Sequence, residues 1–190
     1  MEDKTISPEE SLQLITGMIQ TAKSNFAKGG SFYFLLWGGV IAAANFGHFI
    51  LGALVEYPYP YVVWLVIIPA VIITIVYSIR VKRSSPVKSS FDRIYGQLWW
   101  TVFVAIMIVL IFMSELNYNT TPVILLFSAI GTYITGQILR FKPLIAGGVS
   151  LFAMAIVAFM LDVQYQFLLA GFAMLAGYII PGILLKREER

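Results

Sequence analysis

Asn45 and His48 are the two polar side chains whose types and spacing come closest to a binding site. They lie three residues apart in an apolar stretch, so on a helix both can face one direction. In one interpretation, the amide and the imidazole line an outward-facing pocket for a small solute, together with Trp64. In the interpretation that we favour, they hydrogen-bond neighbouring helices to each other.

Three acidic residues, Glu56, Glu115 and Asp162, each follow the end of a predicted helix. A helix C-terminus disfavours a negative charge by about 0.3–1 kcal/mol, so these carboxylates do not cap their helices. If the preceding helices cluster, the three carboxylates could ring the outer mouth of a ligand site and attract a cation or a basic partner. The favoured interpretation is that they are solvated loop residues.

No metal, cofactor or catalytic centre is predicted. His48 is the only histidine and cysteine is absent, whereas zinc and haem sites need several such ligands. Gly148-Val149-Ser150 resembles part of the motif of intramembrane serine proteases, but Leu151 replaces the second glycine of that motif. The histidine also precedes the serine instead of following it. We therefore expect a protein that is not an enzyme.

Six apolar stretches must position these residues, and none of them contains Asp, Glu, Lys or Arg. Each stretch is 19 to 24 residues long, and about 20 apolar residues suffice to cross a bilayer. The predicted spans are 32–55, 61–79, 94–114, 121–139, 143–161 and 167–185. The expected fold is all-α: a polytopic membrane bundle of six transmembrane helices, preceded by a cytoplasmic amphipathic helix.

The distribution of positive charge predicts the orientation of these spans. All 13 Lys and Arg residues lie in the N-terminal segment, in 80–93, in 140–142 and in the C-terminal tail. The alternate connections contain none; these are 56–60, 115–120 and 162–166. Because short cytoplasmic loops are enriched in Lys and Arg, we expect both termini on the cytoplasmic side of a bacterial inner membrane.

Composition agrees with a membrane protein. Of 190 residues, 59% are hydrophobic and 12% are charged, against about 25% charged in an ordinary soluble domain. The expected organisation is a helix and hinge over 1–30, a transmembrane domain over 31–186 and a cytoplasmic tail over 187–190. The net charge of +3 is modest and favours contact with anionic lipid headgroups over nucleic acid.

The N-terminal segment carries a helix start at Ser7-Pro8-Glu9-Glu10, with a Ser cap, Pro in the first turn and Glu completing a capping box. An apolar stripe follows at steps of three and four: Leu12, Ile15, Ile19, Ala22 and Phe26. This amphipathic helix either lies in the membrane interface or docks a partner or a second copy.

The segment 80–93 is basic, rich in serine and interrupted by Pro86. Its positive residues are Arg80, Lys82, Arg83, Lys88 and Arg93. Topology enforcement is the favoured interpretation, and a surface for lipid headgroups or an acidic partner is the alternative.

Small residues recur at every fourth position in three of the predicted spans, which lets helices approach closely. They are Gly39, Ala43 and Gly47; Ser128, Thr132 and Gly136; and Ala173 and Gly177. We expect this spacing to serve packing within the chain. Pro69 lies inside the predicted span 61–79 and Pro181 inside 167–185, and each would free a backbone carbonyl, as in the broken helices of transporters.

Residues 8–50 resemble small uncharacterised bacterial membrane proteins, through Glu9-Glu10-Ser11-Leu12 and Ser31-Phe32-Tyr33-Phe34-Leu35-Leu36-Trp37-Gly38. This resemblance implies no known activity. With six predicted spans, the chain is also similar in size to the vitamin-binding S-components of energy-coupling transporters. Those families often dock a transmembrane partner through a small-xxx-small stretch in the first span, and Gly39, Ala43 and Gly47 would be its counterpart.

Two classes of function are therefore expected. The favoured one is a non-enzymatic accessory or regulatory membrane subunit that docks a cytoplasmic or membrane partner, or a second copy, through its cytoplasmic face. The helix Pro8–Phe26 and the segment 80–93 would form that face. The alternative is a subunit that binds or transports a small solute. Its outward-facing site would contain Asn45, His48, Trp64, Glu56, Glu115 and Asp162.

Overall fold

The computed structural model describes Ser7, residues 29–84 and residues 90–189, and their side chains outside 81–92. This part of the chain is all-α and contains no strand. In order, the elements are α2 (Gly30–Phe49), the π-helical turn η1 (Ile50–Leu54), the 3₁₀ helix η2 (Pro60–Val66), α3 (Ile67–Ser84), α4 (Ser90–Ile111), α5 (Thr121–Leu139), α6 (Lys142–Ala158), α7 (Val163–Met174), the π-helical turn η3 (Leu175–Ile179) and α8 (Ile180–Glu188).

Part of the predicted cytoplasmic face lies outside the described residues. This applies to the N-terminal amphipathic helix, with Leu12, Ile15, Ile19 and Phe26, and to Lys88. It applies also to the side chains of Lys82 and Arg83 at the end of α3. Their roles stay predictions.

Five helical stretches are long and apolar enough to cross a membrane: Gly30–Leu54, Pro60–Arg80, Arg93–Ile111, Thr121–Leu139 and Val163–Glu188. α6 is also apolar, but with 17 residues it spans only about 25 Å and stands at the lower end of the usual range. It ends before the predicted 161 because Phe159–Leu161 form a tighter turn, in which Leu161 N–H donates to Ala158 O. These lengths indicate a multi-pass membrane protein.

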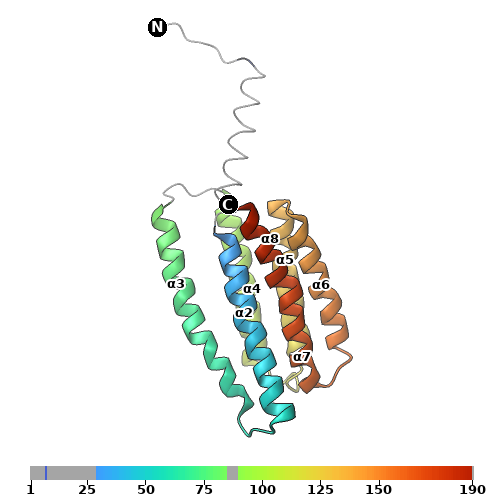
Figure 1. The fold of residues 1–190 in the computed structure, drawn as a ribbon. Coiled ribbons are helices and arrows are strands. Elements are labelled where there is room, and N and C mark those ends of the chain that lie inside the picture. The colour runs from blue at the N-terminus through green and yellow to red at the C-terminus, as the bar shows by residue number, and fades with distance from the viewer. Residues whose placement is uncertain (1–6, 8–28, 85–89, 190) are drawn as a thin grey trace.

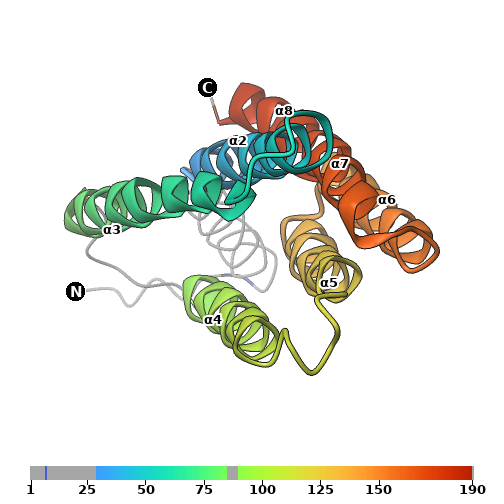
Figure 2. The ribbon, with the colours of Figure 1, turned by 90° about the horizontal axis from the view of Figure 1, so that it is seen from below.

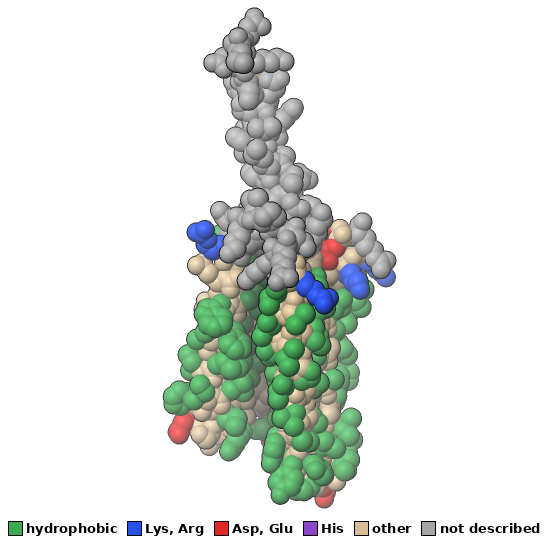
Figure 3. Space-filling model, turned by 90° about the vertical axis from the view of Figure 1, so that its left-hand side faces the viewer, with side chains coloured by type: hydrophobic (Ala, Val, Ile, Leu, Met, Phe, Trp, Pro, Cys, Tyr) green, Lys and Arg blue, Asp and Glu red, His purple; other side chains and the backbone are tan. Residues whose placement is uncertain are grey.

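The helices run alternately up and down, which separates the charged residues into two ends (Figure 1). The connections that follow η1, α4 and α6 lie at one end, which we call the acidic end because it carries Glu56, Glu115 and Asp162. The other end, the basic end, holds the end of α3, the start of α4, the α5–α6 connection and the end of α8. Figure 3 shows the visible Lys and Arg side chains gathered at the basic end.

The core lies between α2, α5, α6 and the continuous stretch α7–η3–α8. α5 and α6 form the most closely packed pair, and α7 and α8 pack along α2. Most of the buried apolar residues are small or medium in size, among them Leu125, Ala129, Leu144, Leu151, Ala155, Ala158 and Ala173, and the large ones include Phe34, Phe141 and Tyr178. α3 is held by α2 and η2, and α4 is held by α5, so these two helices stand at the margin of the bundle (Figure 2).

Pro181 shapes the last span without breaking it. Proline has no N–H to donate and crowds the carbonyl four residues earlier, here that of Gly177. The π-helical turn η3, which ends just before α8, accommodates this loss by widening the helix locally. The carbonyl of Gly177 then packs against α6, since a Cβ built on Gly147 would lie 2.8 Å from its oxygen. This carbonyl is therefore a packing surface and not an exposed substrate contact.

Pro69 likewise sits near a change of helix type. Residues Pro60–Val66 form a 3₁₀ helix, and the α-helical part of the span begins only at Ile67. Pro69 therefore lies in the first turn of α3, where a missing backbone N–H costs little. The predicted mid-span break is replaced by a short 3₁₀ entry to the helix.

Candidate functional site

The small residues at every fourth position form three rows, which we call stripes. Neighbouring helices pack against two of these stripes, as expected. Ser128, Thr132 and Gly136 of α5 are buried, and a Cβ on Gly136 would lie 2.7 Å from the backbone nitrogen of Ile145 in α6. Ala173 and Gly177 are buried as well, and the side chain of Leu151 occupies the space beside Gly177. In both places a small residue allows close packing.

The third stripe, on α2, is open. Gly39 and Ala43 are exposed, and a Cβ built on Gly39 would meet no atom within 4 Å. α2 turns a different line of residues towards the core, including Gly38 and Ala42, and a Cβ on Gly38 would lie 2.7 Å from Cβ of Tyr178. The expectation of packing within the chain is therefore wrong for Gly39 and Ala43. It holds only for Gly47, which faces Val63 at 3.2 Å.

His48 and Trp64, predicted to share a site, are in contact. Trp64 Nε1–H donates to His48 Nδ1 at 3.0 Å, and the imidazole stacks on the ring of Phe167 with centroids 3.9 Å apart. This cluster joins α2, η2 and α7 near the acidic end. Asn45 lies one turn away and is buried, and its Nδ2–H donates to Ile41 O of the same helix at 2.8 Å. His48 and its partners therefore resemble an interhelical clamp more than a ligand pocket, whereas the hydrogen bond of Asn45 lies within α2.

The three predicted acidic residues are exposed, and each belongs to a different connection. Viewed along the bundle, these connections lie at separate edges of the acidic end (Figure 2). Glu56 has a left-handed backbone with φ 54°, where the chain reverses after η1. The carboxylates are therefore solvated loop residues in this arrangement, which is the interpretation favoured from sequence.

At the basic end, the termini of two distant helices meet. Ser31 N–H donates to Glu189 Oε1 at 2.9 Å, and Ser31 Oγ donates to Glu189 Oε2 at 2.6 Å. The carboxylate lies at the N-terminus of α2, where the helix dipole favours negative charge. Arg80 and Arg93 of the predicted basic surface are both exposed at this end.

Sequence reasoning missed an aromatic cluster that holds α4 to the bundle. Trp99 contacts Phe34 and Tyr178 at centroid distances of 5.8 and 6.3 Å, and its Nε1–H donates to Thr135 Oγ1 at 3.2 Å. The hydroxyl of Tyr178 lies near those of Ser128 and Thr132, although Thr132 Oγ1 has no partner with hydrogen-bond geometry among the described residues. The available signal was the spacing of polar residues in the 121–139 span, which marks its buried face.

α3 and α4 leave the side of the bundle hollow. Figure 3 faces this side and shows two apolar ridges with a hollow between them. The exposed apolar side chains on these helices include Ile68, Ile72, Val76, Phe103 and Ile111. Such surfaces suit lipid tails.

The described residues contain no group of three or more His, Cys, Asp or Glu side chains that could hold a metal ion. The described residues do offer packing surfaces and a charged end. No family model, no curated protein and no solved structure matches the chain. The candidate site accordingly rests on its own geometry, and its most distinctive element is the open stripe Gly39 and Ala43.

Proposed function

We propose that the protein is a non-enzymatic accessory or regulatory membrane subunit that docks a transmembrane helix of a partner along Gly39 and Ala43. The supporting observation is the difference between this open stripe and the two filled ones. Where the chain packs helices closely within itself, it places a small residue at the contact. On α2 the same spacing presents a shallow surface with nothing against it.

Physical chemistry gives this surface a reason to bind protein. Lipid tails are as apolar as leucine, so no hydrophobic force drives helices together in a bilayer. Association depends instead on close van der Waals contact, which small residues permit by letting two backbones approach. A partner helix on Gly39 and Ala43 would gain such contact with the backbone of α2.

The orientation follows from charge. The positive residues of the described part, among them Arg80, Arg93, Arg140, Lys142 and Lys186, share one end, and short cytoplasmic loops favour such residues. We therefore place the basic end and both termini in the cytoplasm of a bacterial cell, with six spans crossing its inner membrane and α6 as the shortest. The N-terminal helix and the segment 80–93 would extend the docking surface into the cytoplasm.

A solute-binding subunit is the other candidate, and the contacts of its proposed residues count against it. Asn45 is buried and bonded within α2, and His48 Nδ1 and its ring face are occupied by Trp64 and Phe167. A solute would have to displace these contacts. The contact of His48 with Trp64 and Phe167 therefore supports a role in helix packing.

The absence of cysteine allows a direct test of the docking surface. A single cysteine at position 39, in the chain with Gly39→Cys, is labelled with a photoreactive cross-linker in native membranes. The matched control is Ala153→Cys, also exposed but on α6. We expect one defined protein adduct from position 39 and none from position 153, and we expect Ala43→Leu to abolish it while the protein still folds.

Equal adducts at both positions, or adducts with lipid alone, would contradict docking on α2. An adduct with a second copy of the chain would identify a homo-oligomer as the partner. Removal of residues 1–28 tests the cytoplasmic part of the surface separately, since an unchanged set of adducts would exclude its contribution. Ligand-dependent thermal stabilisation that is lost in His48→Ala would instead favour the solute-binding candidate.

A further inference from the structure

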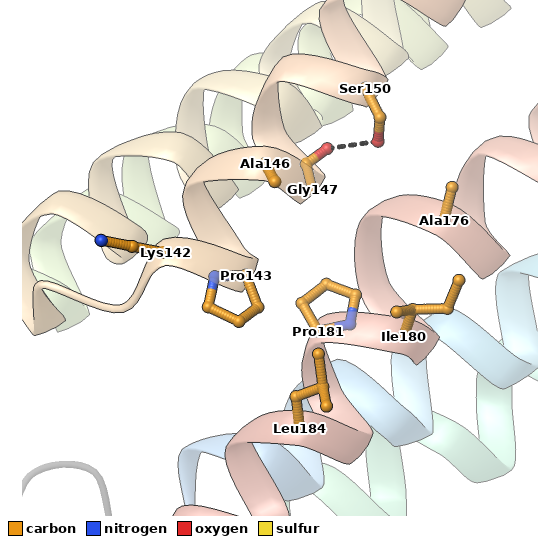
Figure 4. A pocket seen from close by; sticks show the side chains of 9 residues that line it. All are labelled: Lys142, Pro143, Ala146, Gly147, Ser150, Ala176, Ile180, Pro181 and Leu184. Atoms are coloured by element: carbon orange, nitrogen blue, oxygen red, sulfur yellow. Dashed lines mark hydrogen bonds between the residues drawn. The ribbon is translucent and has the colours of Figure 1, made fainter.

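A shallow cleft of about 510 Å³, widely open to the side of the bundle, lies between α6 and α8, away from the open stripe on α2. Its walls come from one face of α6, between Lys142 and Ser150, and from the facing part of η3 and α8, between Ala176 and Leu184. Figure 4 shows Pro143 and Pro181 opposite each other across this space. The cleft exists because Ala146, Gly147 and Ala176 are small, whereas the residues around them are larger.

The lining is suited to a hydrocarbon chain. Its side chains are apolar apart from Lys142 and Ser150, and the hydroxyl of Ser150 donates to Gly147 O at 2.7 Å within the same helix. That hydroxyl therefore requires no partner from outside. The floor is closed by the buried residues Gly147 and Pro181, which lie in close contact. A hydrocarbon chain could enter without stranding a polar group.

The length of the cleft along α6 matches the thickness of one leaflet. Lys142 and Ser150 are eight residues apart on α6, which corresponds to about 12 Å along the helix. Half of a hydrocarbon layer of about 30 Å is about 15 Å. The cleft begins at the basic end and runs towards the middle of the bundle, as one acyl chain of the leaflet on that side would.

Charge at the rim selects the headgroup. Lys142 stands at the first turn of α6 and is exposed, and Figure 4 shows its side chain directed away from the apolar lining. Lys186 and Arg187 are exposed in the last turn of α8 at the same end, but the exposed Glu188 and then Glu189, whose carboxylate accepts from Ser31, follow them directly, so the preference for an anion rests on Lys142. No acidic residue lies in the first turn of α6. A phosphate with net negative charge fits this rim better than a zwitterionic headgroup.

We propose that the cleft between α6 and α8 binds an anionic phospholipid, with one acyl chain against Ala146 and Ala176 and the phosphate at Lys142. The lipid would cover the place where α6, the shortest of the proposed spans, meets the π-helical turn η3. This site is independent of the docking surface on α2, so either proposal can fail alone.

The test uses the full chain in lipid nanodiscs that contain phosphatidylglycerol and phosphatidylcholine with identical oleoyl chains. Lipids retained on release from the nanodisc are counted by native mass spectrometry. We expect one tightly held lipid per chain, with phosphatidylglycerol preferred about fivefold or more, the ratio that corresponds to about 1 kcal/mol for a basic side chain at an anionic surface. Lys142→Gln should remove about this factor, whereas Arg93→Gln, an exposed cation on α4, should not.

Binding of the acyl chain is tested by a matched pair of variants on α6. Ala146→Leu fills the cleft and should abolish the retained lipid, whereas Ala153→Leu, exposed on the same helix but outside the cleft, should leave it. Equal retention of the two lipids, equal losses in Lys142→Gln and Arg93→Gln, or full retention in Ala146→Leu would overturn the proposal. So would a dimer that only Ala146→Leu dissociates, because a second copy would then cover the cleft.

Discussion

α3 and α5 differ in a way that reverses the rule for soluble proteins. The span that contains α3 has the higher mean hydropathy, yet only 6% of its most apolar window is buried in the bundle, against 44% for α5. α5 instead buries Ser128, Thr132, Thr135 and Gly136. In a bilayer, a helix surrounded by lipid must be apolar on every side, whereas small and weakly polar residues mark the faces that pack. Burial here therefore follows side-chain size more than hydropathy.

The helices of the core (α5 and α6) and those of the margin (α3 and α4) also differ in how they are attached to the bundle. α5 and α6 meet along a continuous seam of close backbone contacts, among them those at Gly136 and Gly148. α4 has fewer such contacts: Trp99 reaches across to Phe34, Thr135 and Tyr178, and the buried Val102 packs beside Gly131 of α5. The span formed by η2 and α3 is attached near its two ends. Trp64 of η2 contacts His48 at one end, and Tyr77 and Ser78 of α3 contact Tyr33 at the other. Loss of one contact should therefore affect the margin and the core differently.

The largest expected effect comes from Trp99→Ala, which removes the main attachment of α4. We expect a loss of about 3 kcal/mol in the free energy of unfolding, the lower end of the range for buried aromatic residues, because Trp99 is only partly buried. Trp100→Ala is the control, because Trp100 is the neighbouring residue and is 64% exposed. Both free energies can be measured by reversible denaturation in mixed micelles. Equal losses would mean that Trp99 does not anchor α4.

A second pair compares a filled position with an open one. A Cβ on Gly148 would lie 2.7 Å from backbone atoms of Tyr133, so Gly148→Ala must push α5 and α6 apart, at a cost of about 1–3 kcal/mol. Gly39→Ala meets open space and replaces a helical glycine, which should stabilise the fold by about 0.5–1 kcal/mol. Thermal unfolding in detergent should show opposite shifts. A destabilising Gly39→Ala would show that the α2 stripe is not open in the isolated protein.

Much of this fold could be predicted from the sequence because membranes impose simple rules. Five of the six predicted spans correspond to helices long and apolar enough to cross a membrane, because a span is recognised by its length and its lack of charge. The bounds of Thr121–Leu139 agree with the prediction. The separation of Lys142 and Arg140 from Glu115 and Asp162 also follows from the alternation of connections. The length of α6 was overestimated because its last turn is a tight one that hydropathy does not distinguish from α-helix.

The candidate site could be predicted only in part, for a physical reason. The spacing of Gly39 and Ala43 marks a surface that permits close approach, but spacing does not reveal the rotation of a helix in its bundle. α2 and its neighbours decide that rotation, by burying Phe34 and Gly38 about a third of a turn away. The sequence predicts that His48 and Trp64 share a site. The stacking of His48 on Phe167 could not be predicted in the same way, because it depends on α7, which is more than a hundred residues further along the chain.

The smallest effect tests the attachment of α3 near the acidic end. Trp64→Phe keeps an aromatic ring but removes the N–H that donates to His48 Nδ1, which should cost about 0.5–1.5 kcal/mol. Because this contact holds η2 and not the core, the loss should appear as faster hydrogen exchange in Pro60–Val66 with little change in α5 and α6. Trp100→Phe, on an exposed side chain, should leave exchange in η2 unchanged. If Trp64→Phe instead increased exchange equally in all helices, the margin and the core would unfold as one unit, and the distinction between them would be structural but not energetic.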